Sequence, residues 1–254
     1  MIIQKLINPI TLPLVFFITF SVTQAQLRLD IESGLPFQGY NEVRIPNETG
    51  TTFDFNNDFE LQGPVIPLRL VLSYTFAEKN HLFALFAPLG LDYEGPAPFN
   101  IQFQQSPFTQ GQMIEGFYKF NSYRLGYRRD VLTSDRWTIG VGFTAKIRDA
   151  RVQLTTSEMS DKKDDLGFVP LLHIFAAREF DRWMLYLQGD GLAGGPGRAF
   201  DFFLGGSFRI TDNLSGKAGY RLLEGGADVS DVYNFTLINF AAVGLTLNIL
   251  NRFE

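Results

Sequence analysis

The feature that most constrains this chain is an alternation of apolar and polar residues with a period of two. It is clearest from residue 137 onward, where one alternate set is apolar and the other is polar or small. The apolar set is Trp137, Ile139, Val141, Phe143, Ala145 and Ile147, and the other is Thr138, Gly140, Gly142, Thr144, Lys146 and Arg148. Successive side chains of a β-strand point to opposite faces, so this pattern predicts a strand with one oily and one charged face. Helical spacing is not sustained anywhere, and we predict an all-β fold.

The alternation recurs in ten segments, which we predict to be strands. They are 27–37, 65–76, 82–94, 117–132, the segment from 137, 168–180, 183–192, 199–210, 215–223 and 232–250. In the fourth segment, Lys119 and Asn121 are out of phase with the residues from 123 onward, which predicts a bulge or a loop end there. The predicted connections alternate in length. Short turns occupy 77–80, 133–136, 181–182 and 211–214, and longer loops occupy 46–64, 95–116, 155–167, 193–198 and 224–231.

Alternation alone does not say which face is inside, but the residue types do. The polar face carries nine cations and eight anions, with small residues between them. The cations are Arg28, Arg69, Arg124, Arg128, Lys146, Arg148, Arg209, Lys217 and Arg221, and the anions are Asp30, Glu32, Asp92, Glu94, Asp130, Glu179, Asp190 and Asp201. Such a balance suits a confined lumen in which each charge needs a partner. We therefore predict a lumen network of these residues with His173, and an apolar face turned to lipid. A secreted β-sandwich with a solvated charged face is the alternative.

Composition excludes several classes of protein. The chain has 254 residues and no cysteine, which excludes disulfide frameworks, thiolate metal sites and cysteine nucleophiles. The balance of 22 basic to 27 acidic residues argues against nucleic-acid binding. We predict no cofactor.

The first 25 residues have the pattern of a cleaved secretory signal. Lys5 supplies the positive region, an apolar run follows, and Thr23 and Ala25 occupy the small-residue positions before a cleavage point. We predict a signal peptide over 1–25 and one barrel domain over 26–254. No later segment has 18 consecutive apolar residues, so no transmembrane helix is expected.

With its alternating strands and its short and long connections, the chain resembles bacterial outer-membrane β-barrel proteins over 27–250. This resemblance implies an up-and-down antiparallel barrel of about ten strands in a Gram-negative outer membrane. It implies periplasmic termini, contact with outer-membrane lipid and lipopolysaccharide, and insertion by the barrel-assembly machinery. The two tryptophans, Trp137 and Trp183, each follow a short turn, where an interfacial aromatic girdle is expected. The terminal aromatic typical of such proteins is displaced here, because Phe253 is penultimate.

Catalytic and metal-binding patterns are weak. His173 and Glu179 fall on the predicted lumen face, but no Gly-x-Ser-x-Gly elbow accompanies them. The run from Asp54 to Asp58 begins like a calcium loop, yet Phe59 replaces the required glycine and Val65 the bidentate glutamate. We predict no catalytic and no metal-binding residues.

The long loops are the best functional lead. Aromatic residues stand among amides and other polar residues in both early loops, and they are candidates to contact a surface ligand or a partner protein. They are Phe53, Phe55, Phe99, Phe103 and Phe108. In the alternative interpretation, these rings fold over the barrel mouth or sit in the outer aromatic girdle.

We predict a structural or surface-binding barrel with a narrow, charge-filled lumen. One alternative is a narrow transporter or channel for small or hydrophobic molecules. It would need a gap in the charge network or a lateral opening, and Gly189, Gly191 and the loop 194–197 are the first candidates for its position. A second alternative is a barrel-embedded enzyme that hydrolyses lipid A or peptides.

Overall fold

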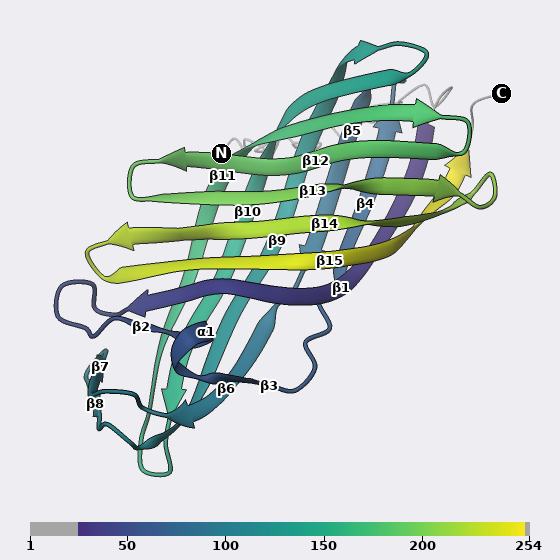
Figure 1. The fold of residues 1–254 in the computed structure, drawn as a ribbon. Helices are drawn as coiled ribbons and strands as arrows, with labels where there is room; N and C mark the ends of the chain where they lie inside the picture. Colours follow the sequence, from purple (N-terminus) through teal and green to yellow (C-terminus); the bar gives the residue numbers. More distant parts are fainter. Residues whose placement is uncertain (1–24, 252–254) are drawn as a thin grey trace, which may run out of the picture.

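The computed structural model describes residues 25–251 and shows a closed barrel (Figure 1). The predicted signal peptide lies outside the described residues apart from Ala25, and so does Phe253. The barrel elements are β1 (Ala25–Arg44), β4 (Arg69–Phe76), β5 (Asn80–Ala87), β6 (Gly90–Pro96), β9 (Met113–Thr133), β10 (Trp137–Thr155), β11 (Ser160–Phe180), β12 (Trp183–Gly194), β13 (Gly197–Arg209), β14 (Leu214–Val229) and β15 (Val232–Asn251).

Every barrel strand pairs antiparallel with its neighbours along the chain. β5 and β6 both pair with β9 and together form one barrel strand, so the wall has ten strands. The first and last strands close it, because β1 pairs with β15 on one side and with β4 on the other. The predicted ten-stranded antiparallel up-and-down barrel is therefore confirmed.

Two connections carry structure of their own at one end of the barrel. The first contains β2 (Phe53–Asp54), α1 (Phe55–Asp58) and β3 (Glu60–Gln62), and the second contains β7 (Ile101–Phe103) and β8 (Ser106–Phe108). The single helical turn α1 begins where the Asp54 side chain accepts a hydrogen bond from the Asn56 amide. The four short turns lie at the opposite end, with Ala25 and Asn251.

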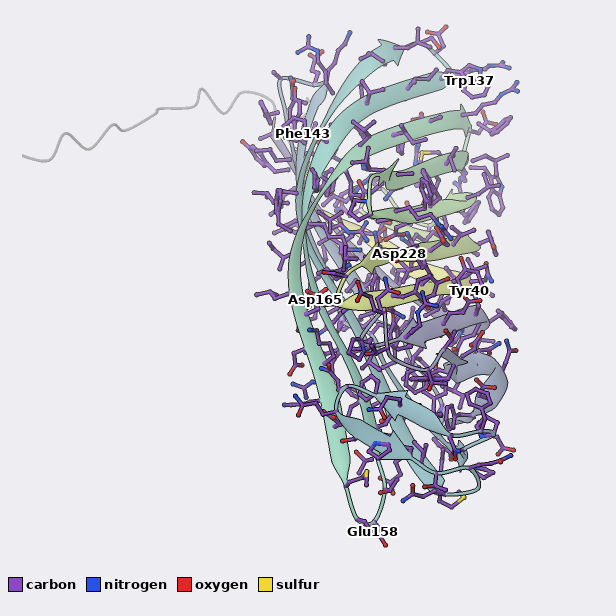
Figure 2. The ribbon with its side chains drawn as sticks, turned by 90° about the vertical axis from the view of Figure 1, so that its left-hand side faces the viewer. Tyr40, Trp137, Phe143, Glu158, Asp165 and Asp228 are labelled. Atoms are coloured by element: carbon purple, nitrogen blue, oxygen red, sulfur yellow. The ribbon has the colours of Figure 1, made fainter. Side chains whose placement is uncertain are left out.

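The loops predicted at 155–167, 193–198 and 224–231 are mostly strand, and this prediction was wrong. The β10–β11 ladder continues to the Thr155–Ser160 pair, β12–β13 to Gly194–Gly197, and β14–β15 to Val229–Val232. Apolar alternation does not reveal these stretches as strand, because the residues on both of their faces are largely polar or small. The β10–β11 hairpin extends farthest, and Figure 2 shows its tip at Glu158, far from Trp137.

The out-of-phase half of β9 marks a change of environment, not a bulge. Its register with β10 is continuous from Gly140 to Thr155. Along β9, Ser122 and Arg124 point inward in one half, whereas Tyr118 and Phe120 point inward in the other. The strand keeps its geometry, but its inward face is polar in the first of these halves and apolar in the second.

An apolar core fills this second half of the barrel and accounts for the exchange. Rings from the two structured loops pack with inward residues of β6, β9, β10 and β15. The buried members are Val43, Ile45, Phe53, Phe55, Phe59, Leu89, Leu91, Tyr93, Ala97, Ile101, Phe103, Phe108, Ile114, Tyr118, Phe120, Val152, Leu154, Ile238 and Phe240. This part of the molecule has the ordinary arrangement of a water-soluble protein, with an apolar inside and a polar outside.

The predicted orientation of 82–94 was wrong for the same reason. Phe83, Leu85 and Tyr93 are buried inside the barrel, whereas Asp92 and Glu94 are exposed on the outer surface. Both faces of β5 are apolar, so alternation could not orient it. Asp92 and Glu94 lie where the outer face of the wall is polar, and they therefore do not belong to the lumen.

The other half of the barrel presents an apolar band outward. Leu125, Phe143 and Phe168 are each more than 60% exposed, and Figure 2 shows Phe143 pointing away from the wall. Trp137 and Trp183 are exposed directly after short turns, at one edge of this band. Within residues 25–251, no helix is long and apolar enough to cross a membrane.

Replacing Phe55 tests the apolar core in the half of the barrel that contains the two structured loops. Its ring is fully buried and stacks on Tyr93 with centroids 4.7 Å apart. We expect Phe55→Ala to lower the free energy of unfolding by about 3–5 kcal/mol, the usual cost of such a cavity. Phe99→Ala, at a half-exposed loop ring, is the matched control and should change it by about 0.5 kcal/mol or less. Urea titration in detergent micelles measures both, and equal losses would contradict this packing.

Candidate functional site

In the half of the barrel that carries the outward apolar band, the lumen is organised around Asp201, on β13. Its carboxylate is 3% exposed and accepts hydrogen bonds from three arginines on three other strands. The distances are 2.9 Å from Arg69 on β4, 2.6 Å from Arg124 on β9 and 2.5 Å from Arg221 on β14. One buried carboxylate therefore links strands from around the barrel across its interior.

Arg124 extends the network to the strands β10, β11 and β12. Its second terminal nitrogen lies 2.6 Å from Asp190. Asp190 also accepts a hydrogen bond from Thr144 at 2.7 Å and lies 2.8 Å from Nδ1 of His173. The predicted residues Asp190 and His173 are brought together here, whereas Thr144 was not predicted because a threonine carries no charge pattern.

Arg221 extends the network to β1. It lies 2.5 Å from Glu32, which also accepts a hydrogen bond from Lys217 at 2.6 Å. Lys217 reaches Asp30 as well, at 2.5 Å. Each of these cations contacts two carboxylates, which compensates for the cost of removing the charges from water.

A second, smaller cluster lies nearer the short turns. His81 Nε2 is 2.8 Å from Asp130, and its Nδ1 is 2.9 Å from the Thr75 hydroxyl. Arg128 lies 3.0 Å from the same Asp130, and its guanidinium covers the Phe175 ring at 4.1 Å. Sequence reasoning missed His81, because its inward orientation depends on the same β5 face that alternation could not assign.

Three further predicted lumen residues lie at the periphery. Glu179 and Arg209 are exposed where β11 and β13 end at the short turns, and including them in the network was wrong. Both belong to the inward-facing alternate set of their strands, but the barrel wall no longer surrounds them at the strand ends. Arg28 is half-buried on the inward side of β1.

The inward charges do not balance once Glu179, Arg209 and the outward Asp92 and Glu94 are removed. Eight of the predicted cations remain inside, against five anions. The cations are Arg28, Arg69, Arg124, Arg128, Lys146, Arg148, Lys217 and Arg221, and the anions are Asp30, Glu32, Asp130, Asp190 and Asp201. Asp165, which was not predicted, pairs with Arg148 at the rim. Among these residues an excess of two positive charges remains.

The candidate loop contacts lie mostly inside. Phe53, Phe55, Phe103 and Phe108 are buried in the apolar core, so their predicted availability to a surface ligand was wrong. Only Phe99 of the five, at 36% exposed, reaches the surface. The rings fold over the barrel mouth because the outer half of the barrel would otherwise enclose unfilled space.

Ion pairs lie on the outer surface of the barrel, in the half where that surface is polar. A hydrogen bond from Lys119, at 2.6 Å, lowers the pKa of the Asp149 carboxyl below its ordinary value. Arg151 does the same to the pKa of Asp164. Since a lowered pKa favours the ionised form, these contacts support the β9–β11 sheet near neutral pH and weaken as pH falls through the lowered values.

Neither histidine completes a hydrolytic site with a serine. His173 is buried between Asp190 and the Phe83 ring, whose centroid lies 4.8 Å away. His81 contacts a threonine that is itself buried. In the described part of the chain, both imidazoles act as links in ionic clusters.

Comparison with known proteins identifies the fold. No protein-family model matches the chain, and no curated protein matches it by sequence. Among solved structures, the outer membrane protease OmpT from Escherichia coli aligns with a TM-score of 0.50 at 9% identity, covering 88% of this chain and 97% of its own. The translocator domain of the autotransporter NalP from Neisseria meningitidis aligns at 0.45 and 12%, covering 88% of each chain. Ail, the attachment invasion locus protein of Yersinia pestis, aligns at 0.36 and 11%, covering 88% and 98%.

This is the fold of an outer-membrane β-barrel protein. At these identities the likeness extends to the fold alone, and the catalytic activity in the first name does not transfer with it.

Removing the central carboxylate tests the network. We expect Asp201→Asn, which keeps the side-chain shape, to lower the free energy of unfolding by about 3–5 kcal/mol, since three buried arginines lose their shared partner. Asp212→Asn, in the exposed β13–β14 turn, is the control and should be close to neutral. Urea titration followed by tryptophan fluorescence in detergent micelles measures both. A neutral Asp201→Asn would show that the network contributes nothing to stability.

Proposed function

We propose that this chain is an integral outer-membrane protein with a closed lumen, which acts by binding at its extracellular end. The observation that carries this proposal is the double filling of the interior: a buried ionic network in one half and an apolar core in the other. Wide barrels leave an aqueous channel, whereas barrels near eight strands are filled by side chains. A barrel of ten strands that holds both the ionic network and the apolar core favours a closed lumen.

The membrane location is supported by the outward apolar band. A β-sheet can cross lipid only when closed, because an open edge would leave backbone groups without partners. Here the wall is closed, its outward residues are apolar in one half, and Trp137 and Trp183 lie at the edge of that band. Outer-membrane lipid would contact the band, lipopolysaccharide its outer edge, and the barrel-assembly machinery would insert the chain.

The two ends of the barrel support a proposed orientation in the membrane. Short turns and both described chain ends lie together, which is the periplasmic arrangement of such barrels. The structured loops and the β10–β11 hairpin would then project outside the cell. A binding role fits this arrangement better than catalysis, because the polar clusters are buried and compensated.

Lipid contact is tested on the outward face. We expect Phe143→Arg to destabilise the vesicle-inserted protein by about 2–4 kcal/mol, the cost of an arginine at the membrane midplane. Glu158→Arg, at the hairpin tip outside the band, is the control and should change stability by about 0.5 kcal/mol or less. Urea titration in lipid vesicles measures both. Equal effects, or a wild-type protein that stays soluble without detergent, would contradict the membrane location.

The closed lumen is tested by conductance in planar bilayers. We expect the inserted wild-type protein to show no steady conductance, because the network and the core leave no continuous water path. A shift in gel mobility between unheated and boiled samples verifies that the barrel is folded. Steady, large conductance from folded protein would overturn the closed-lumen proposal.

A further inference from the structure

The barrel wall is interrupted between β11 and β12. Their pairing ends at Leu172 and Gly191, whereas β11 continues to Ser160 paired with β10 alone. Pro170, which has no N–H to donate, lies in this unpaired edge, as prolines in strands usually do. In Figure 2, the β10–β11 hairpin continues well below both Asp228 and Asp165 to its tip at Glu158.

A cavity of about 330 Å³ occupies this interruption. Its lining includes Lys146, Phe168, Pro170, Leu192, Pro196 and Ala199. A neighbouring cavity of about 300 Å³ shares Phe120 and Arg148 with it. Phe168 belongs to the outward apolar band and is 65% exposed, so the cavity runs from the barrel interior to the outer apolar surface.

The glycines that predicted a lateral opening define its position. Phe202 and Phe200 cover Gly189 and Gly191, since an added Cβ would approach their rings within 2.2 Å and 2.7 Å. These two positions are therefore closed. The turn 194–197 does line the cavity, and at Gly194 an added Cβ would meet nothing within 4 Å. The opening lies beside the predicted glycines, between β11 and β12.

Lys146 lines this cavity without an ion-pair partner among the described residues. It is 2% exposed, and its ammonium lies 4.7 Å from the centroid of the Phe120 ring. Among the described residues, no carboxylate lies within 4 Å of it and no acceptor bonds to it. The neighbouring Arg148 pairs with Asp165, but its Nε is buried and has no acceptor. An ammonium without an acceptor and a second cation therefore line the same cavity, which agrees with the positive excess of the lumen, and a bound anion would supply the acceptor that Lys146 lacks.

We infer that this cavity binds a single-chain anionic amphiphile of the fatty-acid type. Its carboxylate would bind Lys146 and Arg148, and its chain would pass between β11 and β12 toward the membrane, along Leu192 and Phe168. The volume is at the lower end of small-molecule pockets and suits one acyl chain, not a lipid with several. The inference rests on the proposed membrane location but not on the closed lumen.

Photo-cross-linking tests this site. The folded protein in phosphatidylcholine nanodiscs is labelled with a diazirine-bearing dodecanoate, and the labelled residues are mapped by mass spectrometry. We expect labelling of 168–170 and 192–199, reduced about tenfold in Lys146→Met, as the loss of one charge-assisted bond predicts. Lys79→Met, in the exposed β4–β5 turn at the other end, should label like wild type.

Two further arms separate a site from membrane partitioning. The corresponding diazirine-bearing dodecanol should label these segments about tenfold less, because it lacks the carboxylate. Leu192→Trp keeps Lys146 but fills the cavity, and should abolish labelling there. Labelling spread over the apolar band, or unchanged by Lys146→Met and Leu192→Trp, would overturn the inference. The gel-mobility shift of each variant reports folding separately, and its absence in wild type would contradict the proposed function instead.

Discussion

The pairing of β1 with β15 is the constraint on which the rest of the structure depends. It joins the two ends of the described chain and, with the β1–β4 pairing, closes the sheet into a barrel. Closure allows the outer face to be apolar, because paired strands satisfy one another's backbone groups within the wall. Closure also forces the opposite face of each strand into a confined interior, where charged side chains must satisfy one another.

The interior meets that demand in two ways. Where the outer face is apolar, Asp201 and its three arginines link strands around the barrel. Where the outer face is polar, the loop rings of Phe53 and Phe55 pack against Tyr93 and Tyr118 instead. The same strands cross both zones, so β9 has Arg124 inside in one half and Phe120 inside in the other. Lys146 lies near this transition, covered by Phe120, which is why it can be both buried and unpaired.

Particular residues show how far sequence reasoning reached. The period-two pattern predicted the strand of Lys146 and Arg148 and the side on which both lie. It assigned β5 to the wrong face, because Phe83 and Leu85 alternate with residues that are also apolar. It assigned β6 to the wrong face because the outside of the wall is polar there. It also ended the strands near 155 and 223, since beyond these points the apolar signal is lost although the backbone pairing continues.

The class of fold can be read from the sequence alone, because a period of two over ten segments with charges on one face admits few closed arrangements. The sequence also indicated most of the charged residues that meet in the lumen. Only the tertiary structure decided which charges meet, since Asp201 lies 132 residues from Arg69 and 77 from Arg124. The tertiary structure alone also shows that β11 extends beyond its pairing with β12 and leaves a cavity at Lys146. Pairing across the barrel depends on strand tilt and register, which no local pattern encodes.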